Sequence, residues 1–182
     1  MSINTQRALS YGIELIGTPY GYWRGGKNQK GAPMFAQNGA ELSKKEITSL
    51  NCAGLCNVML RSIGKKLPIC VEENSVGGTE AYFDYYSEKA NDFSIHETYP
   101  MGTLLIRKFR NSDDQGHVAV LLDDGGKTAR VLQSHVDGEF GKSVLPGVNA
   151  SYTLEQSHHA FIDKNGKGCT YEKIVLPADW LD

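Results

Sequence analysis

Apolar positions recur with helical spacing in the first half of the chain. In the segment 3–16 they fall every three or four residues, and a glycine and a proline follow directly. A second helix is predicted over 51–63, because Asn51 is a favourable N-cap and a glycine ends the pattern. A third helix is predicted over 79–90, with Thr79 as its cap. The first half is therefore expected to be helical.

After Pro100 the pattern changes to short runs rich in β-branched and apolar residues, separated by turn signals. The runs that predict strands are 104–109, 117–122 and 129–135, and two later runs, 160–162 and 171–176, could add more. Helices followed by a strand meander indicate an α+β fold, with the N-terminal helices packed on a C-terminal antiparallel β-sheet.

The length of 182 residues fits one domain over 1–182 with a single core. The stretch 27–49 is polar and poorly periodic, so we interpret it as a long insertion loop with a short helix near 42–47.

Charge narrows the possible partners. The formal net charge is −2 with both signs interspersed, which predicts no nucleic-acid partner. No apolar run approaches the length of a membrane span. Polar residues interrupt the first 17 positions, which is not typical of a signal peptide. We therefore expect a cytoplasmic protein, one exported by a leaderless route, or one whose leader has been removed.

The four cysteines are expected to be reduced thiols. Cys52 and Cys56 are four residues apart, and no second close pair of Cys or His accompanies them, so we predict neither a structural metal nor a cofactor. Cys56, Cys70 and Cys169 are interpreted as small buried hydrophobes.

Cys52 is the exception because it directly follows the predicted N-cap Asn51. A thiol attacks a carbonyl as a thiolate, and the positive end of a helix lowers a thiol pKa. His117, at the head of a predicted strand, could take up the proton. The first helical N–H groups have no helical partner, so the N–H of Cys52 could bind an oxyanion.

An imidazole base needs a third polar group to fix its tautomer. Gln133 and His135 alternate with apolar and small residues in the strand that follows, so both point to the same face. Either could hold the second ring nitrogen of His117, and we keep both as candidates.

Four segments, in order, resemble the motifs of the NlpC-type (NlpC/P60) peptidases, papain-like cysteine enzymes that cleave peptide stems of bacterial cell walls. They are GTPYGYWRGG at 17–26, NCAGL at 51–55, PMGTL at 100–104 and GHVAV at 116–120. The resemblance covers roughly 9–135 and implies a papain-like fold.

The resemblance implies Cys52 as nucleophile and His117 as base, with Tyr20 near the oxyanion or the substrate amine. In the family an apolar pair precedes the third residue, and aligning Val131 and Leu132 with that pair selects Gln133. The residue type that is more common at the third position selects His135 instead. Trp23 is a further candidate for lining the substrate groove, although an aromatic cluster is more often core.

The chain departs from the family pattern at two substrate-binding positions. Asn51 stands where the family usually has Asp, and Ala53 where it usually has Ser. An Asn offers no carboxylate to an ammonium group, so the usual substrate comes into question while the nucleophile does not.

We therefore predict a cysteine endopeptidase or amidase that hydrolyses peptidoglycan-type stem peptides through a thioester. Such a chain could be a delivered toxin, a phage lysis factor or a peptide-recycling enzyme, and an immunity or delivery partner stays open. One alternative is a papain-like transacylase or glutamine deamidase. Another is a catalytically inert binding module of the same fold, which the intact Cys52 and His117 disfavour.

Overall fold

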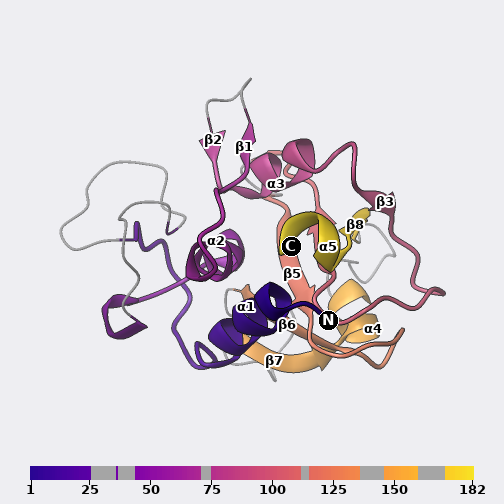
Figure 1. Cartoon of the computed structure of the whole chain (residues 1–182), viewed down its shortest axis with the longest axis horizontal. Helices are drawn as coiled ribbons and strands as arrows, with labels where there is room; N and C mark the ends of the chain where they lie inside the picture. Colours follow the sequence, from indigo (N-terminus) through magenta and orange to yellow (C-terminus); the bar gives the residue numbers. More distant parts are fainter. Residues whose placement is uncertain (26–35, 37–43, 71–74, 112–114, 136–145, 160–170) are drawn as a thin grey trace.

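A computed structural model describes residues 1–25, 36, 44–70, 75–111, 115–135, 146–159 and 171–182 (Figure 1). The helices are α1 (Ile3–Ile13), the 3₁₀ helix η1 (Lys44–Glu46), α2 (Cys52–Ser62), α3 (Thr79–Tyr85), α4 (Leu154–His159) and α5 (Pro177–Trp180). The strands are β1 (Ile69–Cys70), β2 (Ser75–Val76), β3 (Asn91–Asp92), β4 (Leu104–Arg107), β5 (His117–Leu121), β6 (Arg130–His135), β7 (Gly147–Thr153) and β8 (Lys173–Val175).

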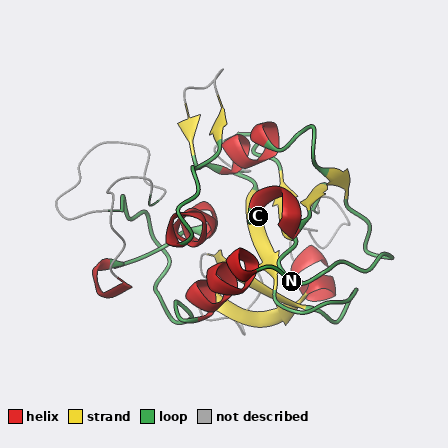
Figure 2. Ribbon diagram, viewed as in Figure 1, coloured by secondary structure: helices red, strands yellow, loops and turns green. Residues whose placement is uncertain are grey.

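The main sheet has the strand order β3-β8-β4-β5-β6-β7, and every neighbouring pair is antiparallel. Figure 2 distinguishes the strands, in yellow, from the helices, in red. Strands β4 to β7 form a meander, and β8 returns from the C-terminal region to pair with the outer edge of β4. Strands β1 and β2 form a separate small hairpin. The predicted α+β class, with helices packed on an antiparallel sheet, is therefore confirmed.

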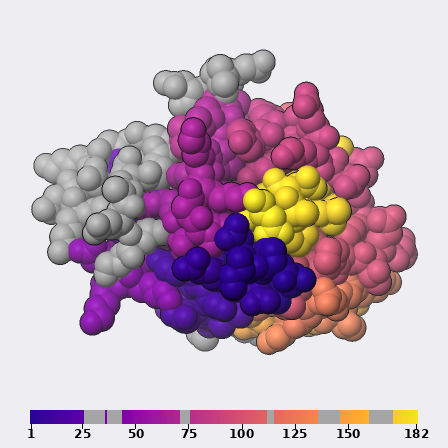
Figure 3. All heavy atoms as spheres, in the orientation of Figure 1, coloured from indigo at the N-terminus to yellow at the C-terminus, as the bar shows by residue number. Residues whose placement is uncertain are grey.

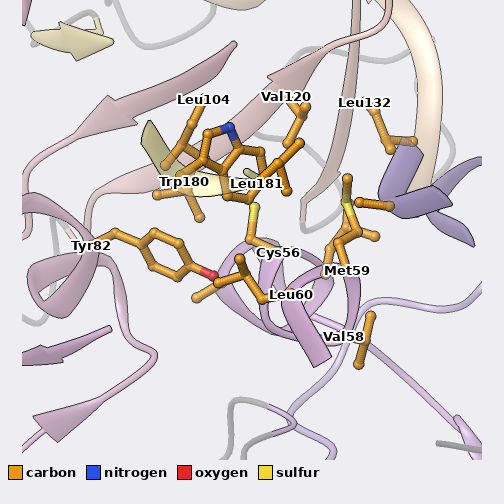
Figure 4. Packing of buried hydrophobic residues seen from close by; sticks show 14 of the residues in the cluster. Cys56, Val58, Met59, Leu60, Tyr82, Leu104, Val120, Leu132, Trp180 and Leu181 are labelled. Atoms are coloured by element: carbon orange, nitrogen blue, oxygen red, sulfur yellow. The ribbon is translucent and has the colours of Figure 1, made fainter. Parts of the chain in front are cut away.

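Alternate residues of the strands divide between two hydrophobic clusters, one on each face of the sheet. The first cluster joins α1, α2 and α5 to residues such as Val118, Val120 and Leu132. Figure 4 shows part of this cluster, with Trp180 beside Cys56. The second cluster lies on the opposite face and contains Ala119, Leu121 and Val131 together with Leu154 of α4 and Tyr171.

Helix α1 crosses close to α2 and β6 at Gly12. A Cβ added there would lie 2.8 Å from Leu132 Cδ2 and 3.0 Å from Met59 Sδ, so a larger residue would require these two side chains to shift. Helix α2, which begins at Cys52, therefore packs between α1 and the sheet.

The local helix predictions hold with one correction. Helices α1 and α2 form where predicted, and Asn51 caps α2. The third helix is shorter than predicted, and its N-cap is Gly78 rather than Thr79. The Thr79 hydroxyl donates instead to the Gln115 carbonyl at 2.6 Å, because that distant loop lies within its reach.

Other predictions meet the structure only in part. Helix η1 falls within the predicted short helix near 42–47, and β8 within the predicted run 171–176. The run 160–162 and most of the loop 27–49 lie outside the described residues. Strand β7 and helix α4 were not predicted.

The two ends of the chain meet on one face of the molecule (Figure 3). The Ser2 hydroxyl donates to the Asp182 carboxylate, and the Thr5 hydroxyl donates to the same oxygen at 3.1 Å. Among the described residues, no helix has both the length and the apolar character needed to cross a bilayer.

Candidate active site

Cys52 is the first residue of α2, and its neighbours cap that helix end. The Asn51 Oδ1 accepts the Gly54 N–H at 2.7 Å, and the Leu55 N–H donates to the Asn51 carbonyl at 3.0 Å. These bonds leave the N–H groups of Cys52 and Ala53 outside the hydrogen-bond ladder of the helix. Cys52 is partly exposed, and the helix dipole favours its thiolate.

Gly54 makes room for this cap. A Cβ at residue 54 would lie 2.9 Å from Asn51 Oδ1 and 3.4 Å from Leu50 Cδ2. A larger residue would therefore push the capping oxygen away from the helix end that carries Cys52.

His117 begins β5 directly after a sharp turn. Gly116 has a φ of +73°, and a Cβ there would lie 2.5 Å from the Arg107 carbonyl oxygen. Glycine meets both demands, and the bond from Thr79 to the Gln115 carbonyl holds the turn from the other side. Both contacts fix the backbone from which the His117 ring projects.

Cys52 and His117 lie at the same end of the sheet. Because β5 and β6 are antiparallel, the first residues of β5 lie beside the last residues of β6. At that end the Ser134 hydroxyl donates to the Leu50 carbonyl at 2.6 Å, two residues before Cys52. This bond ties the start of α2 to the strand ends around His117.

Tyr171 links the two groups further. Its ring centroid is 6.3 Å from that of His117, and its side chain is buried. Burial raises the pKa of Tyr171, the hydrogen bond to Ser157 opposes that rise, and the charge of a Cys52 thiolate adds to it. The phenol therefore lies within electrostatic reach of the Cys52 sulfur and beside the His117 ring.

Gln133 holds one nitrogen of His117. The distance between His117 Nε2 and Gln133 Oε1 is 3.0 Å, and both side chains are buried. A carbonyl oxygen only accepts, so Nε2 carries the proton and Nδ1 becomes the basic nitrogen. This is the tautomer that a histidine base needs when the other ring nitrogen receives the proton of a nucleophile.

The His117 imidazole is neutral at rest. Burial lowers its pKa to about 3, the bond to Gln133 opposes this, and the charges of Arg107 and His135 lower it further. A neutral ring can accept a proton from a thiol, so this protonation state suits a general base better than half of a permanent ion pair.

His135, the other candidate third residue, binds a different amide. Asn149 Nδ2 donates to His135 Nε2 at 3.1 Å, so the lone pair of that nitrogen is engaged and the ring proton lies on Nδ1. His135 is buried, and its charge acts on His117, so the two rings are neighbours. The hydrogen-bond partner of His117 Nε2 is Gln133.

Tyr20 lies in a loop that is bound to the residues before α2. The Leu50 N–H donates to the Pro19 carbonyl at 2.9 Å, and the Gly21 N–H donates to the Leu50 carbonyl at 3.3 Å. The Tyr20 and Tyr22 hydroxyls are 3.5 Å apart. The backbone on either side of Tyr20 is therefore bound to Leu50, the residue before the N-cap of α2.

The remaining substrate-binding candidates are less exposed. Asn51 is buried and its oxygen is used in the cap, while Ala53 is buried in the first hydrophobic cluster. Trp23 is half-buried and packs against the same cluster. Ala53 and Asn51 therefore offer little surface to a substrate, whereas Tyr20 remains partly exposed.

Three residues at the site were missed by sequence reasoning. Ser157 donates to Gln133 Oε1 at 3.2 Å, Tyr171 contacts the His117 ring, and Asn149 binds His135. Only Tyr171 carried a signal, since it opens a predicted strand. Ser157 and Asn149 come from α4 and β7, which the sequence pattern did not predict.

Metal ligands do not gather at this site. In the described parts of the chain, no three side chains of His, Cys, Asp or Glu come together in a way that could hold an ion. Cys52, Cys56 and Cys70 form no disulfide within the described residues. Burial, with a contribution from Cys52, raises the pKa of Cys56 well above its usual range, which makes that thiol unreactive.

No protein-family model and no curated protein matches this chain. A solved structure similar to it is that of a protein from Staphylococcus aureus subsp. aureus Mu50 described as "similar to lipoprotein, NLP/P60 family". The two share 17% sequence identity at a TM-score of 0.45, and the match covers 96% of this chain but 42% of that protein. The chain thus spans less than half the length of that protein.

Proposed function

We propose that this protein is a cysteine endopeptidase or amidase that hydrolyses amide bonds in peptidoglycan-type stem peptides. The observation that carries the proposal is the bond from His117 Nε2 to Gln133 Oε1. It makes Nδ1 the basic nitrogen of a buried histidine at the sheet end where Cys52 begins α2.

In the proposed reaction, His117 Nδ1 takes the proton of the Cys52 thiol as the sulfur attacks the carbonyl carbon. The resulting oxyanion is bound by the N–H of Cys52, with the Tyr20 hydroxyl as a second donor. The His117 imidazolium then protonates the amine, the C–N bond breaks, and a thioester remains. Water, deprotonated by His117, attacks the thioester and releases a carboxylic acid and the thiol.

The helix end and the buried histidine both contribute to activating the thiol. The dipole of α2 stabilises negative charge on sulfur by roughly 0.3–1 kcal/mol. Burial disfavours the imidazolium, so the transferred proton is held only while a thiolate or oxyanion lies beside it. Gln133 stabilises that cation through its carbonyl oxygen.

A second candidate reaction is acyl transfer or glutamine deamidation through the same thioester. Two positions that bind a stem peptide in the family are not available for that role here, which favours this second candidate. The Asn51 oxygen caps α2, and Ala53 is buried. In that case an acceptor other than water takes the acyl group, or ammonia is the leaving amine. An inert binding module is the third reading, and it predicts no turnover at all.

The test is mass spectrometry of muropeptides after incubation of purified peptidoglycan with the protein. We expect new peptide fragments with the parent chain and a loss of at least about 10³-fold in rate for Cys52→Ala. Cys70→Ala is the matched control, because Cys70 is a buried thiol that donates to the Asp84 carboxylate and has no role in the proposed reaction.

The outcomes separate the three readings. Equal hydrolysis by the parent and the Cys52→Ala variant would show that the nucleophile is wrong. Ammonia release or a transferred acyl group without chain cleavage would select the second candidate. Binding of peptidoglycan that is identical in the parent and in Cys52→Ala, with no new fragment, would select the binding module.

A further inference from the structure

Gln133 is oriented by a hydrogen-bond chain that no motif contains. The Tyr171 and Ser157 hydroxyls are 2.7 Å apart, and the Ser157 hydroxyl donates to Gln133 Oε1 at 3.2 Å. The same oxygen receives His117 Nε2–H at 3.0 Å. All four side chains are buried, at 0–3% exposure.

The donors in this chain run in one direction. Ser157 has a single hydroxyl proton, and it is used toward Gln133, so the Tyr171 phenol must donate to the Ser157 oxygen. The Gln133 oxygen then accepts twice, from Ser157 and from His117. Two donors converging on one oxygen hold the carbonyl end of the amide toward the histidine.

The other end of the amide has no such anchor. Gln133 Nε2 is buried and has no hydrogen-bond partner among the described residues. A rotation of the amide by half a turn would place that NH₂ group against His117 Nε2. It would then donate to the ring, and the ring proton would move to Nδ1, the nitrogen that must be basic for attack by Cys52.

We propose that Ser157, itself held by Tyr171, is a positioning residue that fixes the orientation of Gln133 and thereby the tautomer of His117. The proposal deepens the proposed function, since it assigns the residues that keep its base competent. Its consequence is that α4 and the segment at Tyr171, both far along the chain from the catalytic motifs, set the chemistry at Cys52.

The effect of removing the hydroxyl follows from the geometry. Ser157→Ala removes one of the two donors on Gln133 Oε1 and leaves the amide free to turn. We expect the ring proton of His117 to redistribute from Nε2 toward Nδ1. Where turnover is measurable, kcat should fall about tenfold with little change in KM, as for other groups that orient a catalytic ring. Ser157→Thr retains a hydroxyl and should preserve the parent tautomer.

The decisive measurement is nitrogen NMR of the full chain with labelled histidine near pH 7, where the low pKa of His117 keeps its ring neutral. The His117 signals are assigned by their loss in His117→Gln. We expect protonated Nε2 in the parent and in Ser157→Thr, and a shift toward protonated Nδ1 in Ser157→Ala. His135 is the internal reference, because Asn149 donates to its Nε2 and keeps the proton on Nδ1 in all three proteins.

The readout does not depend on any substrate, so the inference and the proposed function can fail separately. Protonated Nδ1 in the parent would overturn the inference, as would an unchanged His117 tautomer in a folded Ser157→Ala variant. If Ser157→Ala fails to fold, the double variant Ser157→Ala with Tyr171→Phe removes the stranded phenol hydroxyl as well, which is the less costly change. The same tautomer shift is expected there, and its absence would equally overturn the inference.

Discussion

Two buried histidine–amide pairs lie next to each other on one face of the sheet, and the hydrogen bond between ring and amide runs in opposite directions in the two pairs. In the first, His117 donates from Nε2 to the carbonyl oxygen of Gln133. In the second, His135 accepts at Nε2 from the amide nitrogen of Asn149. The first pair leaves a basic Nδ1, whereas the second engages the basic nitrogen of its ring.

The two amides also differ in what fixes their orientation. The backbone fixes Asn149, since its Nδ2 donates to the Gly147 carbonyl at 3.1 Å and its Oδ1 accepts the Ser151 N–H at 3.2 Å. Gln133 is fixed through the side-chain hydroxyl of Ser157. The orientation of Asn149 therefore depends on the main chain, whereas that of Gln133 depends on another side chain.

The largest expected effect separates the two histidines. His117→Gln removes the base and should lower kcat/KM for muropeptide release by at least about 10³-fold. His135→Gln should stay within about tenfold of the parent, because a Gln oxygen can accept the Asn149 N–H in place of the ring nitrogen. Rates of fragment release, measured by mass spectrometry on both folded variants, make the comparison.

Thermal unfolding of each variant is the control, since both histidines are buried. If His135→Gln loses as much activity as His117→Gln while its melting temperature is unchanged, the two pairs act as one catalytic unit. The functional contrast drawn between them would then be wrong.

The next effect separates the two amides. Gln133→Met keeps the length of the side chain but removes the acceptor of His117, so kcat should fall about 10²-fold with KM nearly unchanged. Asn149→Leu should instead cost stability by about 1–3 kcal/mol, because the Gly147 carbonyl, the Ser151 N–H and His135 all lose a partner.

Steady-state kinetics and urea unfolding of the same two variants test this division. A large loss of kcat in Asn149→Leu, together with an unaltered unfolding free energy, would mean that the second amide also acts in the reaction.

The sequence was sufficient to predict the helix and the strand that carry Cys52 and His117, because these elements depend on local signals. The start of α2 follows from the N-cap Asn51 and the helical pattern after it, and β5 follows from its apolar run after Gly116. These features are set by neighbours in the chain, so a single sequence carries them.

The choice between Gln133 and His135 could not be made from the sequence, because both side chains project from the same side of β6. The two residues differ in their partners, because β7 brings Asn149 to His135 and α4 brings Ser157 to Gln133. Strand β7 also pairs with β6 through a register irregularity between Val131 and Gln133, which period-two reasoning cannot anticipate. Thr79 shows the same limit on a smaller scale, since a loop 36 residues away takes its hydroxyl.

The last expected effect is on stability against pH, and it concerns the first pair. The pKa of His117 falls from 6.5 to about 3 in the folded protein, mainly through burial. Below about pH 6.5 the unfolded chain therefore binds a proton at this residue that the native protein does not bind. Its contribution to stability is complete above pH 6.5 and is lost as pH falls toward 3, with a slope of at most about 1.4 kcal/mol per pH unit.

Urea unfolding of the parent and of His117→Gln between about pH 5 and 7 isolates this contribution, since the native carboxylates contribute equally to both proteins. The parent should lose stability more steeply than the variant on acidification, because glutamine does not titrate. Parallel curves for the two proteins would mean that folding does not lower the pKa of His117, because the native and unfolded states would then bind protons at this residue equally. A parent that gains stability relative to the variant on acidification would mean that folding raises this pKa, as in a thiolate–imidazolium ion pair. The contrast with His135 would then lie in charge rather than in tautomer.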